Sequence, residues 1–304
     1  MPEVKATDSV YLMSYFKASA QHLFYAYSRD GKTWTDINGS RPVFNAYDDE
    51  VWLRDPYLHR VTHNGKTKFH LIHTWGWDHP ALFHWESDDL IHWTAANGGT
   101  RTDDGKIMLM DGHDGGPVSP NAWAPEFTYD GQTGTFYLYW SSRIGDRQVH
   151  HYCTTKDWLT FSTPAVYFDP GFTAIDMTIL KEGDTYYAYY KDERNGEKTI
   201  RCATSKSLDP RVQRFEGSTP LLPSRYIEVE GPEVFPAIGG KGWFLYFDKF
   251  NGDRGVSYTG CTDPSQHKWY PIPDDEIRNP TEVKHGSVEI ISTAELEKLL
   301  KHFK

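Results

Sequence analysis

Residues 24–34 of this chain read FYAYSRDGKTW, an alternation of aromatic and polar residues that ends in Ser28 and a turn. The same kind of stretch returns four times, at spacings of 50 to 68 residues, and each copy reaches a serine or threonine. The later copies are FHWESDDLIHW (83–93), HHYCTTKDWLTF (150–161), IRCATSKS (200–207) and VSYTGCTD (256–263). Repeats of about this length, filled with short strands, are typical of propeller blades. The repeat therefore predicts an all-β, five-bladed β-propeller of four-stranded blades, with each copy as a third strand.

The two ends of the chain complete one blade between them. The first unit offers only three strand-like runs, within residues 10–37, and a fourth run, HGSVEIIS, stands at 285–292. We expect the ring to be closed by this C-terminal strand pairing with the N-terminal blade, since closure removes open sheet edges. Ser292 and Glu295 form a capping-box pattern, which predicts a short helix at about 292–303. Residues 1–304 are then expected to form a single domain.

Composition narrows the classes of function. The net charge is −10 without a lysine or arginine cluster, so we expect no nucleic-acid partner, because a phosphate backbone would be repelled. No apolar run approaches the ~18 residues of a membrane span, and residues 1–6 lack the segments of a secretion signal. We expect a soluble monomer, cytoplasmic unless a signal peptide has been removed, in which case it is periplasmic or secreted.

The three cysteines fall at equivalent places in the repeat. Cys153, Cys202 and Cys261 each lie in a third-strand copy, just before its serine or threonine. This placement indicates small strand residues rather than a disulfide framework or a metal site.

Acidic residues and a histidine recur where the innermost strand of each unit should begin. Innermost strands of a propeller run along its axis, so their first residues should converge at one mouth of the ring. Carboxylates that meet there repel each other, which raises at least one pKa and lets a protonated acid coexist with an ionised base. Glycoside hydrolysis needs this combination, whereas a turn role is the alternative for each residue alone. The five residues are Asp55, Glu126, Asp176, Glu230 and His285.

An ordered set of short motifs then resembles a known family, glycoside hydrolase family 43, from about Asp55 to Val288. Its members are five-bladed propellers that act on glycans containing arabinose, xylose or galactofuranose. The motifs are RDPYL (54–58), FHLIHTWGW (69–77), WAPEFTYD (123–130), FYLYWSS (136–142), IDMTILKEGDTYYAYYKDE (175–193), EGPEVF (230–235), GWFLYFDKF (242–250) and HGSV (285–288).

The resemblance implies a role for each matched residue. Asp55 would be the general base, Asp176 the residue that tunes and holds the acid, and Glu230 the general acid of an inverting hydrolysis. His285 matches an axial histidine that in many members ligates a structural calcium or sodium ion, and the chemistry itself needs no cofactor. Lys284 stands where related members have arginine, so the contact made by that arginine is not carried over.

Further residues are expected to contact the sugar, because they lie near innermost-strand ends or in the loops after second strands. Packing between blades is the alternative for Trp75 and Trp77, and a solvated loop position is the alternative for Arg143. His73, His79 and His84 are interpreted as packing or surface histidines rather than as zinc ligands. The expected substrate contacts are Arg54, Trp75, Trp77, Trp123, Glu126 and Arg143.

The expected activity is removal of terminal furanose or pentose residues from oligosaccharide or polysaccharide side chains. We rank α-L-arabinofuranose first, β-D-galactofuranose second and β-D-xylose third. A carbohydrate-binding propeller without catalysis would keep the aromatic residues and lose a carboxylate, so the presence of all three acids favours the enzyme. A retaining glycosidase is the other alternative, and the stereochemistry of the product separates the two mechanisms.

Overall fold

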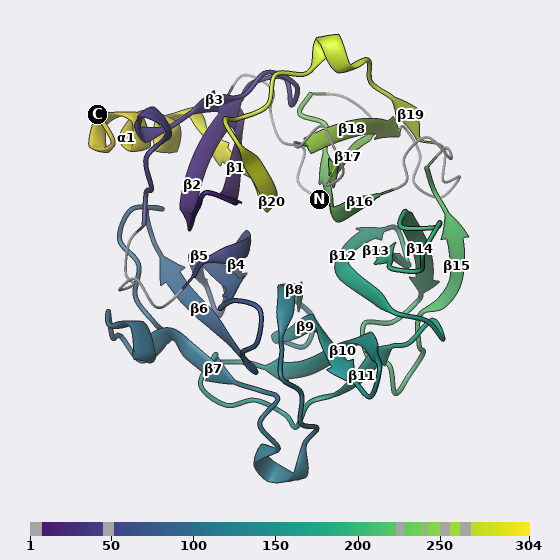
Figure 1. Ribbon diagram of the computed structural model, residues 1–304. Coiled ribbons are helices and arrows are strands. Elements are labelled where there is room, and N and C mark those ends of the chain that lie inside the picture. Colours follow the sequence, from purple (N-terminus) through teal and green to yellow (C-terminus); the bar gives the residue numbers. More distant parts are fainter. Residues whose placement is uncertain (1–7, 45–51, 223–227, 240–241, 250–255, 262–268) are drawn as a thin grey trace.

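The computed structural model describes residues 8–44, 52–222, 228–239, 242–249, 256–261 and 269–304, with the backbone alone for 256–261. Its described strands form five antiparallel sheets, set like blades around a central axis (Figure 1). Each of these sheets has four strands, so the expected all-β propeller of four-stranded blades is confirmed. None of the helices in these ranges combines the length and apolar character that a bilayer-spanning helix requires.

The strands of each sheet follow one another from an innermost strand at the axis to an outermost strand at the rim. The first sheet is β20 (Val283–Ser292), β1 (Ser9–Lys17), β2 (Ala20–Ser28) and β3 (Thr35–Asp36). The second is β4 (Arg54–His63), β5 (Lys66–Thr74), β6 (Ala81–Ser87) and β7 (Lys106–Met108). The third is β8 (Trp123–Asp130), β9 (Thr135–Ile144), β10 (Arg147–Thr155) and β11 (Ala165–Phe168). The fourth is β12 (Ala174–Glu182), β13 (Thr185–Asp192), β14 (Ile200–Ser205) and β15 (Glu216–Pro220). The fifth is β16 (Val229–Pro236), β17 (Trp243–Lys249), β18 (Val256–Cys261) and β19 (Tyr270–Pro271).

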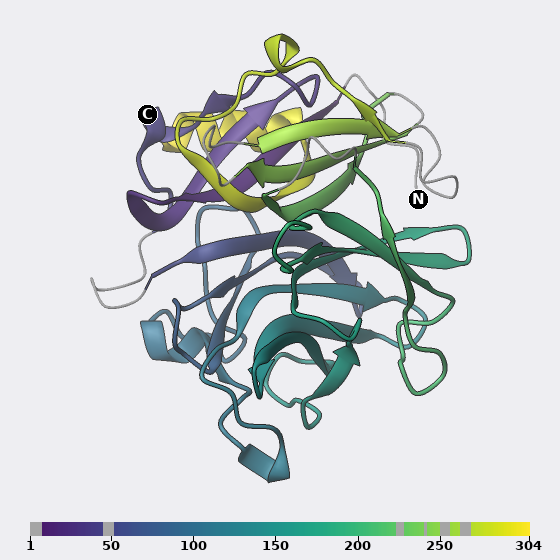
Figure 2. The same ribbon diagram turned by 45° about the vertical axis from the view of Figure 1, so that its right-hand side comes forward.

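The ring is closed by the two ends of the chain, as expected. β1 pairs with β20 from Ser9 opposite Ser292 to Tyr15 opposite Gly286. Figure 2 shows the yellow C-terminal strand and helix lying beside the purple N-terminal strands. Helix α1 (Thr293–His302) follows, and Ser292 accepts the N–H of Glu295 in the predicted capping box. Short 3₁₀ turns occur at Asn38–Ser40, Thr102–Gly105, His113–Gly115 and Asp274–Glu276.

The repeat that predicts the blades is a hydrogen-bonded turn at the end of the third strand. Ser28 Oγ accepts the backbone N–H of Gly31 at 3.0 Å, and Asp30 Oδ1 accepts the next two N–H groups at 2.8 and 2.7 Å. These side chains replace the ladder partners that the backbone loses where the strand ends. The same bonds form at Ser87 with Asp89 and at Thr155 with Asp157.

The buried apolar side chains lie between blades. Those that the structure describes divide into five clusters, each built from two neighbouring blades, and α1 adds Leu296 and Leu299 to the cluster between the first two. Most of the aromatic residues are used in this way, as the sequence indicates. Cys153 and Cys202 are buried free thiols in β10 and β14, as expected, while the side chain of Cys261 lies outside the described residues.

A β-bulge interrupts each innermost strand near its beginning. In β4, β8, β12 and β16 two residues oppose one residue of the second strand, and β20 has the same irregularity at 284–285. The first bulged residue has a positive φ of 44° to 58° in four of them, and bulges of this kind re-aim side chains beside active sites. These four residues are Asp55, Ala124, Asp176 and Gly231.

Candidate active site

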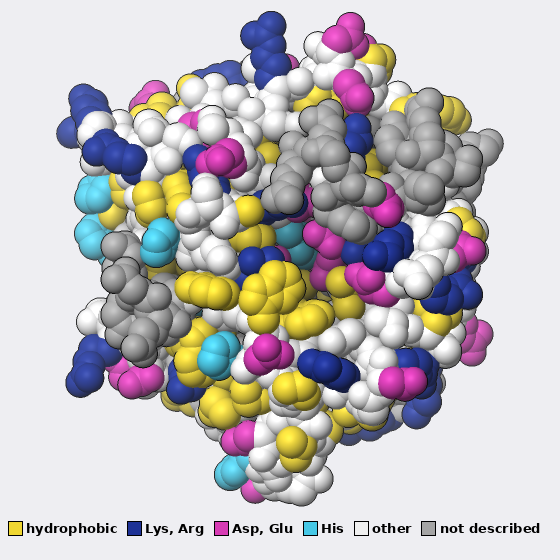
Figure 3. Space-filling view, viewed as in Figure 1, with side chains coloured by type: hydrophobic (Ala, Val, Ile, Leu, Met, Phe, Trp, Pro, Cys, Tyr) yellow, Lys and Arg dark blue, Asp and Glu magenta, His cyan; other side chains and the backbone are white. Residues whose placement is uncertain are grey.

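A cavity of about 470 Å³ opens at the bulged ends of the innermost strands. In Figure 3 the centre of the ring is hollowed, with acidic, basic and histidine side chains in the hollow and hydrophobic side chains along one edge. Its volume lies within the range of small-molecule pockets, about 300 to 1,000 Å³. The expected site residues that line it are Arg54, Asp55, Trp77, Trp123, Asp176, Glu230 and His285.

The structure corrects the position assigned to Glu126. The bulges align Asp55-Pro56 with Ala124-Pro125, so Ala124 occupies the place of Asp55 and Glu126 lies two residues farther along β8. Glu126 is buried and accepts a hydrogen bond from Tyr139 Oη at 3.3 Å, and it does not line the pocket. Burial raises its pKa well above the usual value, and the nearby Glu233 carboxyl adds to this effect. The expectation of an acid or a histidine at one equivalent place in every innermost strand was therefore wrong for β8. In β16 the acid Glu230 lies one residue before that place, which Gly231 occupies.

Asp55 lies on the pocket wall between a hydroxyl and an imidazole. Thr74 Oγ1 donates a hydrogen bond to its Oδ2 at 3.0 Å, and His285 Nδ1 is 3.5 Å from its Oδ1. Burial by itself would raise the pKa of Asp55, but the bond to His285 and the charge of Arg54 outweigh it and lower the pKa. Asp55 is consequently ionised at neutral pH.

Asp176 holds the backbone next to Glu230. Its Oδ2 accepts the N–H of Gly231 at 3.0 Å, and its own N–H donates to Ser141 Oγ at 3.1 Å. Burial is the main cause that raises the pKa of Asp176 to about 7, with the Glu230 charge acting in the same direction and His285 opposing it. The pKa of Asp55 is therefore lowered and the pKa of Asp176 is raised, although both carboxyl groups line the same pocket.

Glu230 is bound by a buried cation. Lys191 Nζ lies 2.9 Å from Glu230 Oε2 and 2.6 Å from Glu193 Oε1, and the Lys191 side chain is only 3% exposed. The Glu230 side chain is 30% exposed and faces the cavity. Its carboxylate is thus fixed on one side by the fourth blade and open to a ligand on the other.

Three nearby carboxylates raise the pKa of His285. Burial lowers its pKa, but the bond to Asp55 and the charges of Asp176 and Asp248 outweigh this and raise the pKa to about 10. The backbone N–H of His285 donates to Asp248 Oδ2 at 3.0 Å. His285 belongs to no group of three or more metal-ligating side chains within 4.8 Å among the residues that the structure describes. An ion at His285 stays a prediction, and the ring contact that the structure describes is the ion pair with Asp55.

Two glycines allow the strands around this histidine to approach closely. A Cβ on Gly231 would come within 2.7 Å of the His285 ring, and a Cβ on Gly286 would come within 1.9 Å of the Ser14 carbonyl oxygen. Gly231 also has a φ of 58°, a conformation that other residues rarely adopt. The glycines of the EGP and HG motifs are thus explained by the close approach of β16, β20 and β1.

Residues near the ends of the second strands form a second set of site residues, which was not predicted from the sequence. Each occupies the same position, opposite the residue just before the bulge, and each contacts the innermost strand of the next blade. A signal was present, because each directly follows the aromatic run of its motif, in FHLIHT, FYLYWS, YYAYYK and WFLYFD. These residues are Thr74, Ser141, Lys191 and Asp248.

Three of the expected sugar contacts lie at one edge of the pocket. Trp123 Nε1 donates to the carbonyl oxygen of Trp77 at 2.7 Å, and the two rings meet edge to face. The Arg54 guanidinium lies 4.3 Å from the centre of the Trp77 ring. Trp77 is 52% exposed, so its apolar face is available to a sugar ring.

Two other expected contacts are not on the pocket wall. Trp75 stacks on His79 with 4.0 Å between ring centres and packs against the core, so the packing alternative holds for it. Arg143 is 3.9 Å from Asp78 and its side chain is 44% exposed, as in the solvated-loop alternative. Their position in the sequence, near the end of a second strand, could not distinguish these two residues from Trp77, which does line the pocket.

Comparison with known proteins gives the family. Residues 8–297 match the family model described as a probable glycosyl hydrolase domain, in the group related to glycoside hydrolase family 43. The chain belongs to this family. The resemblance drawn from the family 43 motifs is confirmed, and the family is one of glycoside hydrolases.

A curated relative of this family 43 chain is an alpha-L-arabinofuranosidase of Bifidobacterium longum subsp. longum. The two are 27% identical over 249 residues, which cover 66% of this chain and 22% of the relative. The chain thus spans about a fifth of the length of that relative.

Solved structures share the fold. An alpha-L-arabinofuranosidase from Clostridium thermocellum is 18% identical, with a TM-score of 0.58 over 88% of this chain and 83% of that chain. A thermostable family-43 glycoside hydrolase is 21% identical, with a TM-score of 0.54 over 76% of this chain and 74% of that chain. At these identities the likeness concerns the fold alone.

Proposed function

We propose that residues 1–304 form one exo-acting, inverting glycoside hydrolase domain, which acts as a monomer on terminal furanose or pentose residues. The observation that carries the proposal is that Asp55, Asp176 and Glu230 line one pocket and have different partners in it. A pair of carboxyl groups in different environments is what separates an acid from a base in glycoside hydrolysis.

In the proposed mechanism the two pocket walls have different tasks. Asp55, ionised and oriented by Thr74 and His285, accepts a proton from a water that attacks the anomeric carbon. Glu230, positioned by Lys191 and protonated in the reactive form, donates its proton to the leaving glycosidic oxygen from the opposite side. A single displacement of this kind inverts the anomeric configuration. Water then restores the protons of both groups for the next turnover.

The shape of the site favours a terminal sugar. A cavity of about 470 Å³ beside Trp77 and Trp123 suits a small ring that stacks on an aromatic face better than a long glycan bound along the surface. The name of the Bifidobacterium relative supports α-L-arabinofuranose as the first choice, with β-D-galactofuranose second and β-D-xylose third. A calcium or sodium ion near His285 remains part of the proposal as a structural element.

A panel of aryl glycosides tests the proposal. We expect release of the aryl group from the α-L-arabinofuranoside and little release from hexopyranosides. Asp55→Asn should release the aryl group from neither substrate. Binding of the sugars without any release would support the non-catalytic carbohydrate-binding propeller instead. Activity on internal bonds of a polysaccharide, with none on the aryl furanosides, would contradict the exo-acting assignment.

A further inference from the structure

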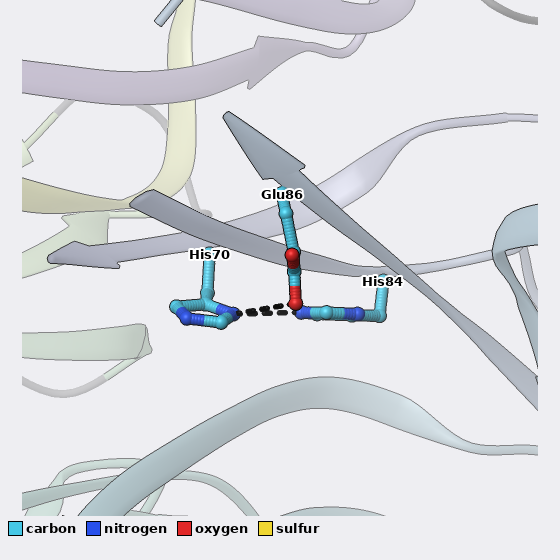
Figure 4. Close-up of side chains that lie close together, drawn as sticks. All are labelled: His70, His84 and Glu86. Carbon is cyan, nitrogen blue, oxygen red and sulfur yellow. Dashed lines mark hydrogen bonds and ion pairs between the residues drawn. The ribbon is translucent and has the colours of Figure 1, made fainter. Parts of the chain in front are cut away.

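Three side chains that could ligate a metal ion meet in the second blade, away from the active-site cavity. His70 Nδ1 is 3.0 Å from His84 Nε2 and 3.9 Å from Glu86 Oε1. One ligand atom from each residue lies within 4.8 Å of the others, and no further group of this kind occurs among the described residues. None of the three lines the active-site cavity. Figure 4 shows the Glu86 carboxylate pointing to the gap between the two rings.

The sheet register brings these side chains to one face. His70 on β5 lies directly opposite Glu86 on β6, and His84 lies two residues before Glu86, so all three project from the same side. That side faces the third blade, where Trp158 stacks on the His84 ring at 3.7 Å and on the His70 ring at 5.6 Å. His84 therefore pairs with His70, and not with His73 and His79 as its place in the sequence suggests.

The chemistry of the three atoms suits a borderline transition metal. His70 Nδ1 and His84 Nε2 lie within hydrogen-bond distance of each other, so a metal ion between them would replace the proton that the two nitrogens share and use a lone pair of each ring. Zinc bonds imidazole nitrogen at about 2.0–2.1 Å in a tetrahedral arrangement, which separates two ligand nitrogens by roughly 3.3 Å. The rings need to part by only a few tenths of an ångström from their present 3.0 Å.

The surroundings leave access for an ion. Glu86 Oε2 pairs with Lys68 Nζ at 2.9 Å, while Oε1 is the oxygen on the side of His70. A second cavity of about 330 Å³ borders His84, and the Asp103 and Asp104 carboxylates line it together with Lys106. This cavity can supply both an entry path and a solvent oxygen for a fourth coordination position.

We propose that His70, His84 and Glu86 form a binding site for one zinc ion, separate from the active site and facing the third blade. The site takes two imidazole nitrogens and one carboxylate oxygen from the protein and a fourth ligand from solvent. Because an ion at this position binds only the folded blade, it stabilises the folded protein without entering the reaction.

Zinc titration of the metal-stripped full chain, followed by calorimetry, tests the site. We expect one ion per chain, and the same site should give Co²⁺ the visible absorption of a tetrahedral complex. His84→Phe keeps a ring against Trp158 and removes a ligand, so it should abolish binding. Glu86→Gln should weaken binding by about tenfold to a hundredfold or more, the cost of losing even an indirect metal contact. His150→Phe is the matched control, since His150 is another buried histidine, stacked on Phe168, and belongs to no such group among the described residues.

The outcomes separate clearly. Binding of one zinc ion that is lost in His84→Phe, weakened in Glu86→Gln and kept in His150→Phe supports the site. Absence of zinc binding by the wild-type chain, or equal binding by Glu86→Gln and the wild type, overturns it. If His84→Phe does not fold by circular dichroism, Glu86→Gln decides alone, because Glu86 is partly exposed and its replacement keeps the side-chain volume. A zinc-dependent rise in melting temperature, kept in His150→Phe and smaller in Glu86→Gln, is the second readout.

Discussion

Asp176 Oδ2 accepts the backbone N–H of Gly231 at 3.0 Å, and so binds the peptide that follows Glu230. The bond joins the bulge of β12 to the bulge of β16, two strands that belong to successive blades. Glu230 is also bound from the same blade as Asp176, through Lys191 on β13. The position of the proposed acid is therefore determined by the fourth blade, although the acid itself belongs to the fifth.

The first prediction concerns the two proposed proton-transfer groups. Asp55→Asn and Glu230→Gln change a carboxyl group to an amide of similar volume, so the fold should persist while turnover falls by about two to four orders of magnitude. Steady-state kinetics on an aryl glycoside, with circular dichroism for the fold, measures this. Asp78→Asn, an exposed carboxyl in the loop that carries Trp77, is the control and should keep normal turnover. Near-normal turnover of folded Asp55→Asn would place the base elsewhere.

Lys191 is predicted to act as a positioning residue. Lys191→Met keeps most of the buried aliphatic volume but leaves Glu230 and Glu193 without their shared cation. We expect kcat to fall about tenfold to a hundredfold, the usual worth of a hydrogen bond to a charged group, and KM to change less. Lys191→Arg should recover part of the loss. Equal loss in both variants, together with an unchanged pH profile, would indicate a structural role only.

Replacement of Gly231 by alanine is predicted to destabilise the fold for a steric reason. In Gly231→Ala the new Cβ meets the His285 ring, and the positive φ adds strain. Gly183 has a similar φ of 56°, and a Cβ added there would meet nothing within 4 Å, so Gly183→Ala isolates the cost of the backbone conformation. Denaturant unfolding should show Gly231→Ala to be less stable than Gly183→Ala by about 1–3 kcal/mol. Equal losses would mean that the His285 ring moves aside freely.

The raised pKa of Asp176 leads us to predict that the stability of the fold depends on pH. Its pKa in the folded protein is about 7, above the usual value of about 3.8, so the folded state holds this proton more tightly than the unfolded state. The resulting contribution to stability is present below about pH 4 and is lost as the pH rises through about 7. Asp176→Asn removes the free-energy cost of burying an ionised carboxylate at this position. The variant should therefore be more stable than the wild type at pH 8 by on the order of a few kcal/mol. Thermal unfolding at pH 4, 6 and 8 measures this, and an advantage that does not grow with pH would contradict it.

The sequence predicts the ring, its closure and seven of the fifteen residues that line the pocket, because these depend on repeated local patterns. The turn at Ser28 and Asp30 is formed by residues close together in the sequence, so its recurrence reveals the blades. The bulges are less visible, since the αL residue can be an aspartate, an alanine or a glycine. Alignment on the proline that forms the second residue of the bulge would have shown that Ala124, and not Glu126, is equivalent to Asp55.

Contacts between blades could not be predicted in the same way. Thr74 and Lys191 are polar residues near the ends of their strands, and only the ring shows that each reaches the next blade. The pair of His70 and His84 is likewise produced by strand register rather than by spacing along the chain.

The stereochemistry of hydrolysis tests the central claim most directly. Proton NMR of the first turnovers on an aryl α-L-arabinofuranoside, recorded before mutarotation, identifies the anomer that the enzyme releases. If Asp55 activates a water opposite Glu230, the first product is β-L-arabinofuranose, with the configuration inverted. Should α-L-arabinofuranose appear first, the reaction proceeds through a covalent intermediate, and the roles proposed for Asp55 and Glu230 are contradicted.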